Sequence, residues 1–425
     1  MTSFRAEAYQ NEYLPVDGSE VNAVVTVTAE MGEGGPDPTG GAAEIVIVDM
    51  SGSMEERAKL LAAREATCVA VECIRDGVEF AVIAGSWDAR PVYPRKGGMA
   101  VADDVTREEA CRAVRQLKAA GGTAMSGWLR MALKTFDGSG AAIRHAILLT
   151  DGRNESDEPG DLERALEECR GRFQCDCRGV GTDWEVDELR RIATALLGTV
   201  DIVAQPEGLV DDFRGLIEGA MGKGAADVSL RLWTPLGARV AFVRQVAPAI
   251  EDLAVRAKPV DERSADYPTG SWGSESRDYH LCIRVEPRGV GEEMLAGRVS
   301  LVVDGEVAGQ SLIRAVWTDD LQLSTRINRE VAHYSGQAEL AEAIQEGLEA
   351  RRAGDEPTAT ARLGRAVQLA AESGNEATMG LLRGVVEVED PATGTVRLRG
   401  DVADADEMSL DTRSTKTVRV KRPEP

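Results

Sequence analysis

The stretch from residue 45 to residue 54, Ile-Val-Ile-Val-Asp-Met-Ser-Gly-Ser-Met, constrains the fold more than any other part of the chain. Its four leading apolar residues lack polar alternation, which is typical of a strand covered on both faces in a parallel sheet. Residues 55–74 then carry apolar side chains at helical spacing and contain no proline. The pattern predicts a strand, a turn and a covering helix, with Asp49, Ser51 and Ser53 on the turn. Open α/β sheets bind their ligands at this carboxyl end of the strands.

Two later segments place further oxygen atoms on loops. Thr123 follows two glycines between helical patterns, and the apolar run 145–150 ends at Asp151. The combined set is Asp49, Ser51, Ser53, Thr123 and Asp151. A set with only oxygen donors selects a hard cation such as Mg²⁺ or Mn²⁺ over zinc or copper. Because three of the five groups are neutral hydroxyls, an ion bound there would still attract an outside anionic oxygen.

An Asp-x-Ser-x-Ser sequence on its own is more often a helix cap than a metal site. Here the later Thr and Asp, in the right order, favour the metal. The arrangement resembles the metal-ion-dependent adhesion site of the von Willebrand factor type A family, over residues from about 42 to 222. The resemblance implies that the two serines and the threonine bind the ion directly, while the two aspartates act mainly through water. It also implies that the site captures an Asp or Glu side chain of a partner protein.

The rest of the chain predicts a multidomain α/β and β protein. Strand and helix signals alternate from residue 44 to residue 221, which predicts a doubly wound, mainly parallel, Rossmann-like sheet. Short strands with turn signals follow and predict a β-sandwich. The β-rich start needs a partner for its edges, so we expect it to join that sandwich. The expected divisions are 1–40 for the N-terminal strands and linker, 41–222 for the type A domain, 225–320 for the sandwich, 321–384 for a helical region, 385–399 for a β-hairpin and 400–425 for a disordered tail.

Two amphipathic segments, 337–352 and 358–371, predict a helical hairpin that loosely resembles one tetratricopeptide unit, with a small helical cap preferred. The tail has an acidic and then a basic half with little to bury. Its hydroxyls at Thr415 and Thr417 are candidate phosphorylation sites. The tail resembles those of actinobacterial-type proteins that work with Ser/Thr kinases and phosphothreonine-reading forkhead-associated domains. A solvated tail, or addition of residues 417–420 as a strand to a partner's sheet, is the alternative.

Composition excludes several classes of function. The net charge of −23 argues against binding to nucleic acid or to an anionic membrane. No apolar run approaches the length of about 20 residues that a membrane span needs, and the start does not resemble a signal peptide. Seven cysteines without a disulfide pattern suit a reducing compartment, so we expect a cytoplasmic protein.

Soft metal ligands are not expected to form a site of their own. Cys175 and Cys177 share one face of a predicted strand, where core thiols are the better interpretation. His280 and Cys282 share a strand face in the same way, without a second pair nearby, so no zinc site is assigned.

The predicted site has no evident catalytic partner. Neither a general base nor a nucleophile accompanies the five residues, and no phosphate-binding loop is present. We therefore expect no enzyme, but a metal-dependent protein–protein interaction module of a bacterial signalling or assembly complex. The alternatives are a Mg²⁺-dependent hydrolase that uses the same oxygens and a structural scaffold whose metal site is vestigial.

Overall fold

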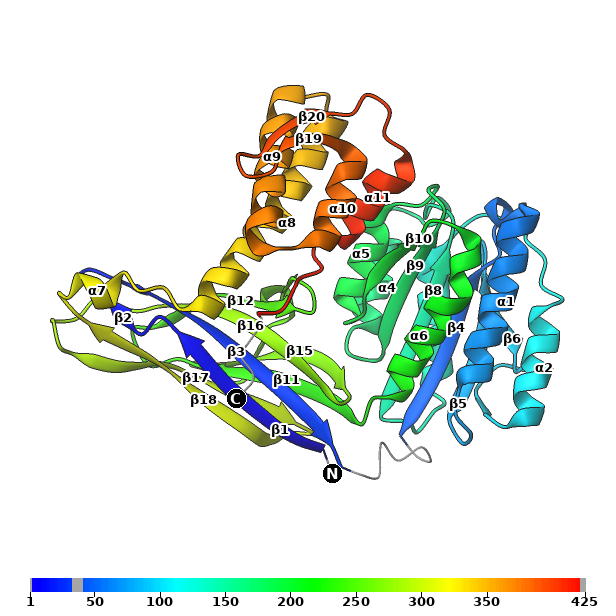
Figure 1. The fold of residues 1–425 in the computed structure, drawn as a ribbon. Helices are drawn as coiled ribbons and strands as arrows, with labels where there is room; N and C mark the ends of the chain where they lie inside the picture. The colour runs from blue at the N-terminus through cyan, green and yellow to red at the C-terminus, as the bar shows by residue number, and fades with distance from the viewer. Residues whose placement is uncertain (1, 33–40, 421–425) are drawn as a thin grey trace. The chain divides into compact units, whose positions relative to one another are not determined.

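The computed structural model describes residues 2–32 and 41–420, so residues 33–40 of the expected linker lie outside the described range. The chain divides into two compact units (Figure 1). One, the α/β unit, is Met31–Ala226; the other, the sandwich unit, combines Met1–Glu30 with Asp227–Pro425. The α/β unit is thus inserted between two parts of the sandwich unit, which agrees with the fold class predicted from the sequence.

The α/β unit is built on a seven-stranded, mainly parallel sheet with the order β10-β9-β8-β4-β5-β6 and with β7 paired to β5. β4 pairs in parallel with both β5 and β8, whereas β6 and β7 run antiparallel to β5. The chain first moves from β4 to β5 and later returns to the other side of β4. The gap between the ends of β4 and β8 is therefore the switch point where such sheets bind ligands. The strands are β4 (Ala42–Asp49), β5 (Glu79–Gly85), β6 (Ala89–Tyr93), β7 (Ala100–Val101), β8 (Ile143–Thr150), β9 (Gln174–Val180) and β10 (Val200–Val203).

Helices cover both faces of this sheet (Figure 1). Val46 and Val48 of β4 are fully buried in one cluster with apolar residues of α1, α2 and α6, and α3 contacts β4 and β5. Burial on both faces explains why β4 reads as an unbroken apolar run. The helices are α1 (Arg57–Cys73), α2 (Asp104–Val114), α3 (Met125–Phe136), α4 (Asp161–Cys169), α5 (Val186–Ala195) and α6 (Leu209–Met221), with short 3₁₀ turns η1 (Gly52–Glu55) and η2 (Pro206–Gly208).

The sandwich unit contains two sheets, ordered β1-β3-β16-β12-β13 and β14-β15-β11-β17-β18-β2. β3 pairs with β16 in an unbroken antiparallel ladder, from Glu20 opposite Arg284 to Ala29 opposite Glu275. β2 pairs with β18 in the other sheet. The N-terminal segment thus contributes to both sheets. The strands are β1 (Thr2–Gln10), β2 (Tyr13–Leu14), β3 (Glu20–Met31), β11 (Ala225–Trp233), β12 (Arg239–Ala247), β13 (Glu251–Asp252), β14 (Lys258–Pro259), β15 (Ser264–Trp272), β16 (Glu275–Arg284), β17 (Glu293–Val303) and β18 (Glu306–Trp317), with the 3₁₀ turn η3 (Ala254–Arg256).

Helices follow the sandwich, and their shared core includes Ile344, Leu363, Leu382 and Leu410. α8 and α9 form the helical hairpin that the sequence predicts, and a third helix continues from it. β19 pairs with β20 in a two-stranded hairpin. The elements are α7 (Leu321–Ser324), α8 (Arg329–Arg352), α9 (Glu356–Ser373), α10 (Glu376–Val385), β19 (Val386–Asp390), β20 (Thr395–Leu398) and α11 (Asp404–Arg413).

The expectation of a disordered tail is wrong for residues 400–420. Within α11 Leu410 is buried, and the acidic residues Glu407 and Asp411 pair with Arg352 of α8 at 2.8 and 2.7 Å. Charges that look solvated in the sequence therefore have partners on α8. Residues 421–425 lie outside the described range.

The segment after α11 docks onto the sandwich. Lys416 forms an isolated antiparallel bridge with Ala249, and the Thr417 hydroxyl donates to the carbonyl of Val246 at 2.6 Å. Arg419 reaches Asp278 of β16 at 3.1 Å. The premise that Thr415 and Thr417 stand on a flexible, unfolded tail is thereby corrected, as is the expectation that residues 417–420 are available as a strand for a partner.

In the part of the chain that the structure describes, no helix has the length and apolar character needed to cross a membrane.

Candidate metal site

The ends of β4 and β8 lie next to each other because the strands are parallel neighbours, with Val48 opposite Leu149. Asp49, the last residue of β4, is fully buried. One of its carboxylate oxygens accepts the Ser51 amide at 2.7 Å, and the other accepts the Thr150 hydroxyl at 2.6 Å. The carboxylate is thus held rigidly between the turn after β4 and the end of β8.

The hydroxyl groups predicted from the sequence come together in front of this carboxylate. Ser51 Oγ lies 2.8 Å from Ser53 Oγ, and Ser53 Oγ donates to Asp151 Oδ1 at 2.6 Å. A Cβ added at Gly152 would lie 3.2 Å from Ser53 Oγ and 3.3 Å from Thr123 Oγ1. Thr123 therefore shares the same small space, and all five predicted residues belong to one cluster.

The loop that carries Thr123 is fixed by its backbone. The Ala120 amide donates to the Met50 carbonyl, and the Gly52 amide donates to the Gly121 carbonyl, both at 2.7 Å. Gly121 has φ +100°, a conformation that favours glycine. Gly121 is thus explained by a tight turn that locks this loop to the turn after β4, and Gly122 by close packing, because an added Cβ would clash with Ser156 Oγ.

The hydroxyl residues line a cleft, whereas the two aspartates do not. Ser51, Ser53 and Thr123 line a cleft of about 370 Å³, together with Gly122, Gly152 and the side chains of Arg153, Glu155 and Asp183. Asp49 and Asp151 are fully buried behind them. The three hydroxyls can meet a ligand directly, whereas the two carboxylates support them from behind.

The two carboxylates differ in their electrostatic surroundings. Burial raises the pKa of Asp49 to about 6, although hydrogen bonds from Ser51 and Thr150 lower it. Among the described residues, no basic side chain forms an ion pair with Asp49. Asp151, in contrast, pairs with Lys59 of α1, whose Nζ lies 3.0 Å from Oδ2.

Lys59 and Thr150 are functional neighbours that the sequence reasoning missed. Burial alone would lower the pKa of Lys59, but its hydrogen bond to Asp151 raises it. The only sequence signal for Lys59 is its position, together with Arg57, in the first turn of the helix after the motif. Nothing local connects Thr150 to Asp49, since their contact depends on β4 and β8 being neighbours.

The residues fit a hard divalent cation. The donor set contains only hydroxyl and carboxylate oxygens, which suit Mg²⁺ or Mn²⁺. A buried carboxylate without a cationic partner, such as Asp49, is costly unless a cation is supplied from outside. No cluster of three or more His, Cys, Asp and Glu side chains that could hold a metal occurs in the described ranges. A metal at this site therefore depends on the hydroxyls.

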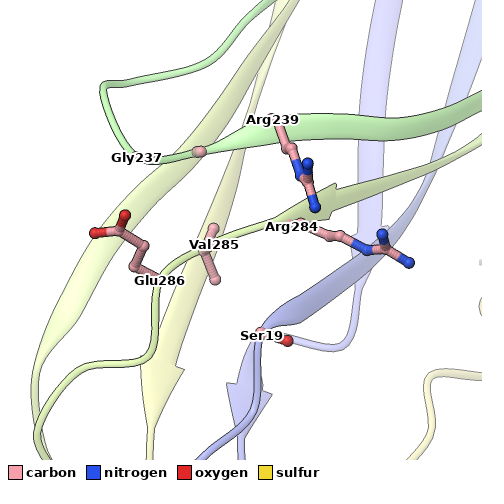
Figure 2. A pocket seen from close by; sticks show the side chains of 7 residues that line it. Ser19, Gly237, Arg239, Arg284, Val285 and Glu286 are labelled. Atoms are coloured by element: carbon pink, nitrogen blue, oxygen red, sulfur yellow. The ribbon is translucent and has the colours of Figure 1, made fainter.

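A second cleft, of about 470 Å³, lies in the sandwich unit (Figure 2). Arg239 and Arg284 stand opposite each other on β12 and β16, and Arg284 pairs with Glu20 at 2.9 Å. Glu286 also lines this cleft and points away from the two guanidinium groups (Figure 2). Two cationic side chains and one anionic side chain line this cleft, and Glu20 neutralises Arg284, so the cleft has no surplus charge that would select an ion. The cleft of the α/β unit is the better functional candidate.

Comparison with known proteins identifies the family of this chain. A structure described as von Willebrand factor type A from Catenulispora acidiphila is 52% identical and has a TM-score of 0.93, and the match covers 98% of this chain and 97% of that one. The chain belongs to the von Willebrand factor type A family. Residues 43–202 match the model of the von Willebrand factor type A domain, and residues 368–414 match that of a von Willebrand factor type A C-terminal domain. No match was found among the curated proteins.

A more distant structure shares the fold of the whole chain. The ArnB paralog VWA2 from Sulfolobus acidocaldarius is 14% identical with a TM-score of 0.57, over 97% of this chain and 98% of that one. Type A domains commonly bind a divalent metal at their adhesion site and act in metal-dependent protein interactions. The C-terminal type A match includes α11, which accords with the order of this part of the tail.

Proposed function

We propose that this type A protein is a metal-dependent protein–protein interaction module. Ser51, Ser53 and Thr123 hold Mg²⁺ or Mn²⁺ directly, Asp49 and Asp151 support them, and an Asp or Glu of a partner completes the coordination. The observation that carries this proposal is the cleft lined by three converging hydroxyls, with two fully buried carboxylates hydrogen-bonded to this cluster and outside the cleft lining. An ion bound mainly by neutral oxygens keeps a strong attraction for an anionic ligand.

The rim of the cleft offers a contact surface for such a partner. Trp87 is 72% exposed, unlike Trp128, Trp184, Trp272 and Trp317, which are buried. A Cβ added at Gly122 would lie 2.5 Å from the Trp87 indole nitrogen, so the ring stands directly beside the cleft. Exposed tryptophans of this kind often dominate the affinity of protein interfaces. The partner's carboxylate on the ion and its neighbouring side chains on Trp87 would together form the contact.

Binding without catalysis is part of the proposal. Among the described residues that line the cleft, none is a histidine or a cysteine. His145 lies at the opposite end of β8, and the other two histidines belong to the sandwich unit. Histidine, the side chain that most often acts as a general base, is therefore distant from the candidate ion, and the serines of the cleft have, in the described part of the chain, no neighbouring histidine to activate them. A cytoplasmic location in a bacterial signalling or assembly complex also remains part of the proposal, supported by the seven free cysteines.

The test combines metal binding with partner binding. Calorimetry on the full chain should show one site for Mg²⁺ or Mn²⁺, and Thr123→Ala should weaken it. Association with partners from the native cells should require the metal, disappear in EDTA and fail with Thr123→Ala. Thr135→Ala is the matched control, because that hydroxyl bonds only to the Met131 carbonyl within α3. Association that persists unchanged in chelator would exclude the proposed mechanism.

A further inference from the structure

Lys59 places an ammonium group against the candidate metal site. Its Nζ lies 3.0 Å from Asp151 Oδ2 and 3.3 Å from Asp183 Oδ2, and its side chain is only 13% exposed. The two carboxylates differ, because Asp151 is fully buried whereas the side chain of Asp183 is 72% exposed. Lys59 therefore bridges a carboxylate of the site and a carboxylate of the loop between β9 and α5.

Lys59 is also connected to the hydroxyls that would bind the ion. Asp151 accepts Lys59 at one oxygen and Ser53 at the other, and Ser53 is hydrogen-bonded to Ser51. An ion on these hydroxyls and the ammonium of Lys59 would share the charge of Asp151. Two cations that share one carboxylate repel each other, and this repulsion is strong where water is largely excluded.

We infer that Lys59 makes the binding of the ion and of the partner's carboxylate cooperative, an inference that rests on the proposed function. By neutralising Asp151, Lys59 weakens the hold of the site on a divalent ion alone. Lys59 adds one positive charge beside an occupied site that also contains the carboxylates of Asp151 and Asp183. The occupied site is therefore one charge more positive with Lys59 than without it. An incoming carboxylate should be attracted more strongly when Lys59 is present.

Asp183 also contributes to this arrangement as a hydrogen-bond partner of Lys59. It gives Lys59 a second acceptor, so the ammonium can remain paired when the ion draws on Asp151. The loop that carries Asp183 turns at Gly181, which has φ +67° and whose added Cβ would lie 3.9 Å from Lys59 Nζ. Removing the charge of Asp183 should leave Lys59 with Asp151 and the more distant Glu56, whose carboxylate lies 3.9 Å away, and so weaken ion binding further.

The first experiment measures the ion alone. Mn²⁺ and Mg²⁺ are titrated by calorimetry into the EDTA-dialysed full-length protein, its Lys59→Met variant and a control, Lys134→Met. Lys134 is exposed on α3, so the control makes the same change in net charge away from the site. We expect Lys59→Met to bind Mn²⁺ on the order of tenfold more tightly than the wild type, with Lys134→Met nearly unchanged. A lysine that merely supports the structure would instead weaken binding when removed.

The second experiment measures how strongly binding of a carboxylate increases the affinity for the ion. The apparent Mn²⁺ affinity is determined with acetate as the carboxylate probe and with chloride at the same ionic strength. Acetate should raise the affinity of the wild type more than that of Lys59→Met. Asp183→Asn should weaken Mn²⁺ binding, whereas Asp187→Asn, a change in a nearby exposed carboxylate, should have less effect. Asp183 is exposed, so this variant serves if Lys59→Met does not fold.

The outcomes separate the two proposals. If the wild type binds neither ion, the proposed function fails and this inference fails with it. If the wild type binds Mn²⁺ but Lys59→Met binds equally or less tightly, only the role of Lys59 is overturned. Equal acetate effects in the wild type and in Lys59→Met would overturn the cooperative coupling alone.

Discussion

The two ends of strands β4 and β8 both contain buried ionisable groups, but the partners of these groups differ. At the amino end, Glu44 and Asp176 of β9 enclose His145, whose two ring nitrogens lie 2.8 and 2.9 Å from their nearest carboxylate oxygens. At the carboxyl end, Asp49 has only a hydroxyl and an amide as donors. Asp151 at the same carboxyl end is paired with Lys59, so Asp49 is the carboxylate of the candidate site that lacks a cation within the described part of the chain and is open to one from outside.

The pKa shifts of the amino-end groups show the effect of their pairing. Burial alone would lower the pKa of His145, but attraction to Glu44 and the hydrogen bond to Asp176 raise it to about 10. Burial would raise the pKa of Asp176, yet the contacts with His145 hold it well below its usual range. Burial raises the pKa of Glu44 despite its contact with His145. The amino-end cluster therefore contains a protonated histidine that the fold stabilises.

The largest expected effect comes from breaking this cluster. His145→Leu should lower the free energy of unfolding by about 3–5 kcal/mol, because it leaves buried carboxylates without their cation. Asp49→Asn should cost much less, since the fold already disfavours the ionised form of Asp49. Urea unfolding of the two variants measures the contrast. Equal losses for both would contradict the distinction between the two ends of the strands.

For metal binding we expect the opposite order, in which changes at the carboxyl end matter more than changes at His145. Asp49→Ala and Asp151→Ala should each abolish Mg²⁺ binding, with a loss of about a hundredfold or more, because both carboxylates orient and charge the hydroxyl donors. The fold should remain intact, as judged by circular dichroism. The matched control is His145→Gln, which alters the other end of the same strands and should retain binding. Full affinity in both aspartate variants would show that the ion binds elsewhere.

The amino-end cluster should also make stability depend on pH. The pKa of His145 is raised from about 6.5 in the unfolded chain to about 10 in the fold. Its contribution is therefore fully present below about pH 6.5 and is lost as pH rises through about 10. The difference in unfolding free energy between wild type and His145→Gln should shrink over this window. A difference that stays constant from pH 6 to about pH 10 would contradict a protonated His145.

The candidate site was predictable because most of its signals are local. The strand from Ile45 to Val48 and the hydroxyls after it stand in one continuous stretch, and chain order brought in Thr123 and Asp151. The contacts of Lys59 and Thr150 were not predictable in the same way, because they depend on which strands and helices become neighbours. The cluster around His145 was missed for the same reason: its three members come from three strands.

For the fold as well, features with a local sequence pattern were predictable and features that depend on tertiary contacts were not. The alternation of strands and helices identified the α/β unit, and the unpaired β-rich start indicated its insertion in the sandwich. β15 is hard to recognise in the sequence because Pro268 and Gly270 interrupt its strand pattern like a turn. The tail was misjudged because its charges look solvated in the sequence, whereas Arg352 and Asp278 provide their partners in the fold.

The smallest expected effect concerns Asp278, another buried carboxylate, which lies outside the candidate metal site. It accepts hydrogen bonds from Thr26 of β3 and Tyr334 of α8, and it pairs with Arg419 of the tail. Like the amino-end cluster, it is satisfied within the chain, so Arg419→Met should destabilise the sandwich unit without affecting metal binding.

Because the side chain of Arg419 is 43% exposed, solvent screens the pair and the expected loss is only about 1 kcal/mol. Arg326→Met removes the same charge from an exposed position and is the matched control.

Limited proteolysis provides the sharper measurement, because Arg419 and the Thr417 hydroxyl both hold the segment after α11 on the sandwich. Arg419→Met should therefore speed cleavage near residues 414–420, and Thr417→Val should do so to a similar extent. The same release would be needed before a kinase could reach Thr417, so phosphorylation of Thr417 should be greater in Arg419→Met than in the wild type. If neither variant changes the cleavage rate, the tail is held by its backbone contacts at Ala249 and Pro248 and not by these side chains.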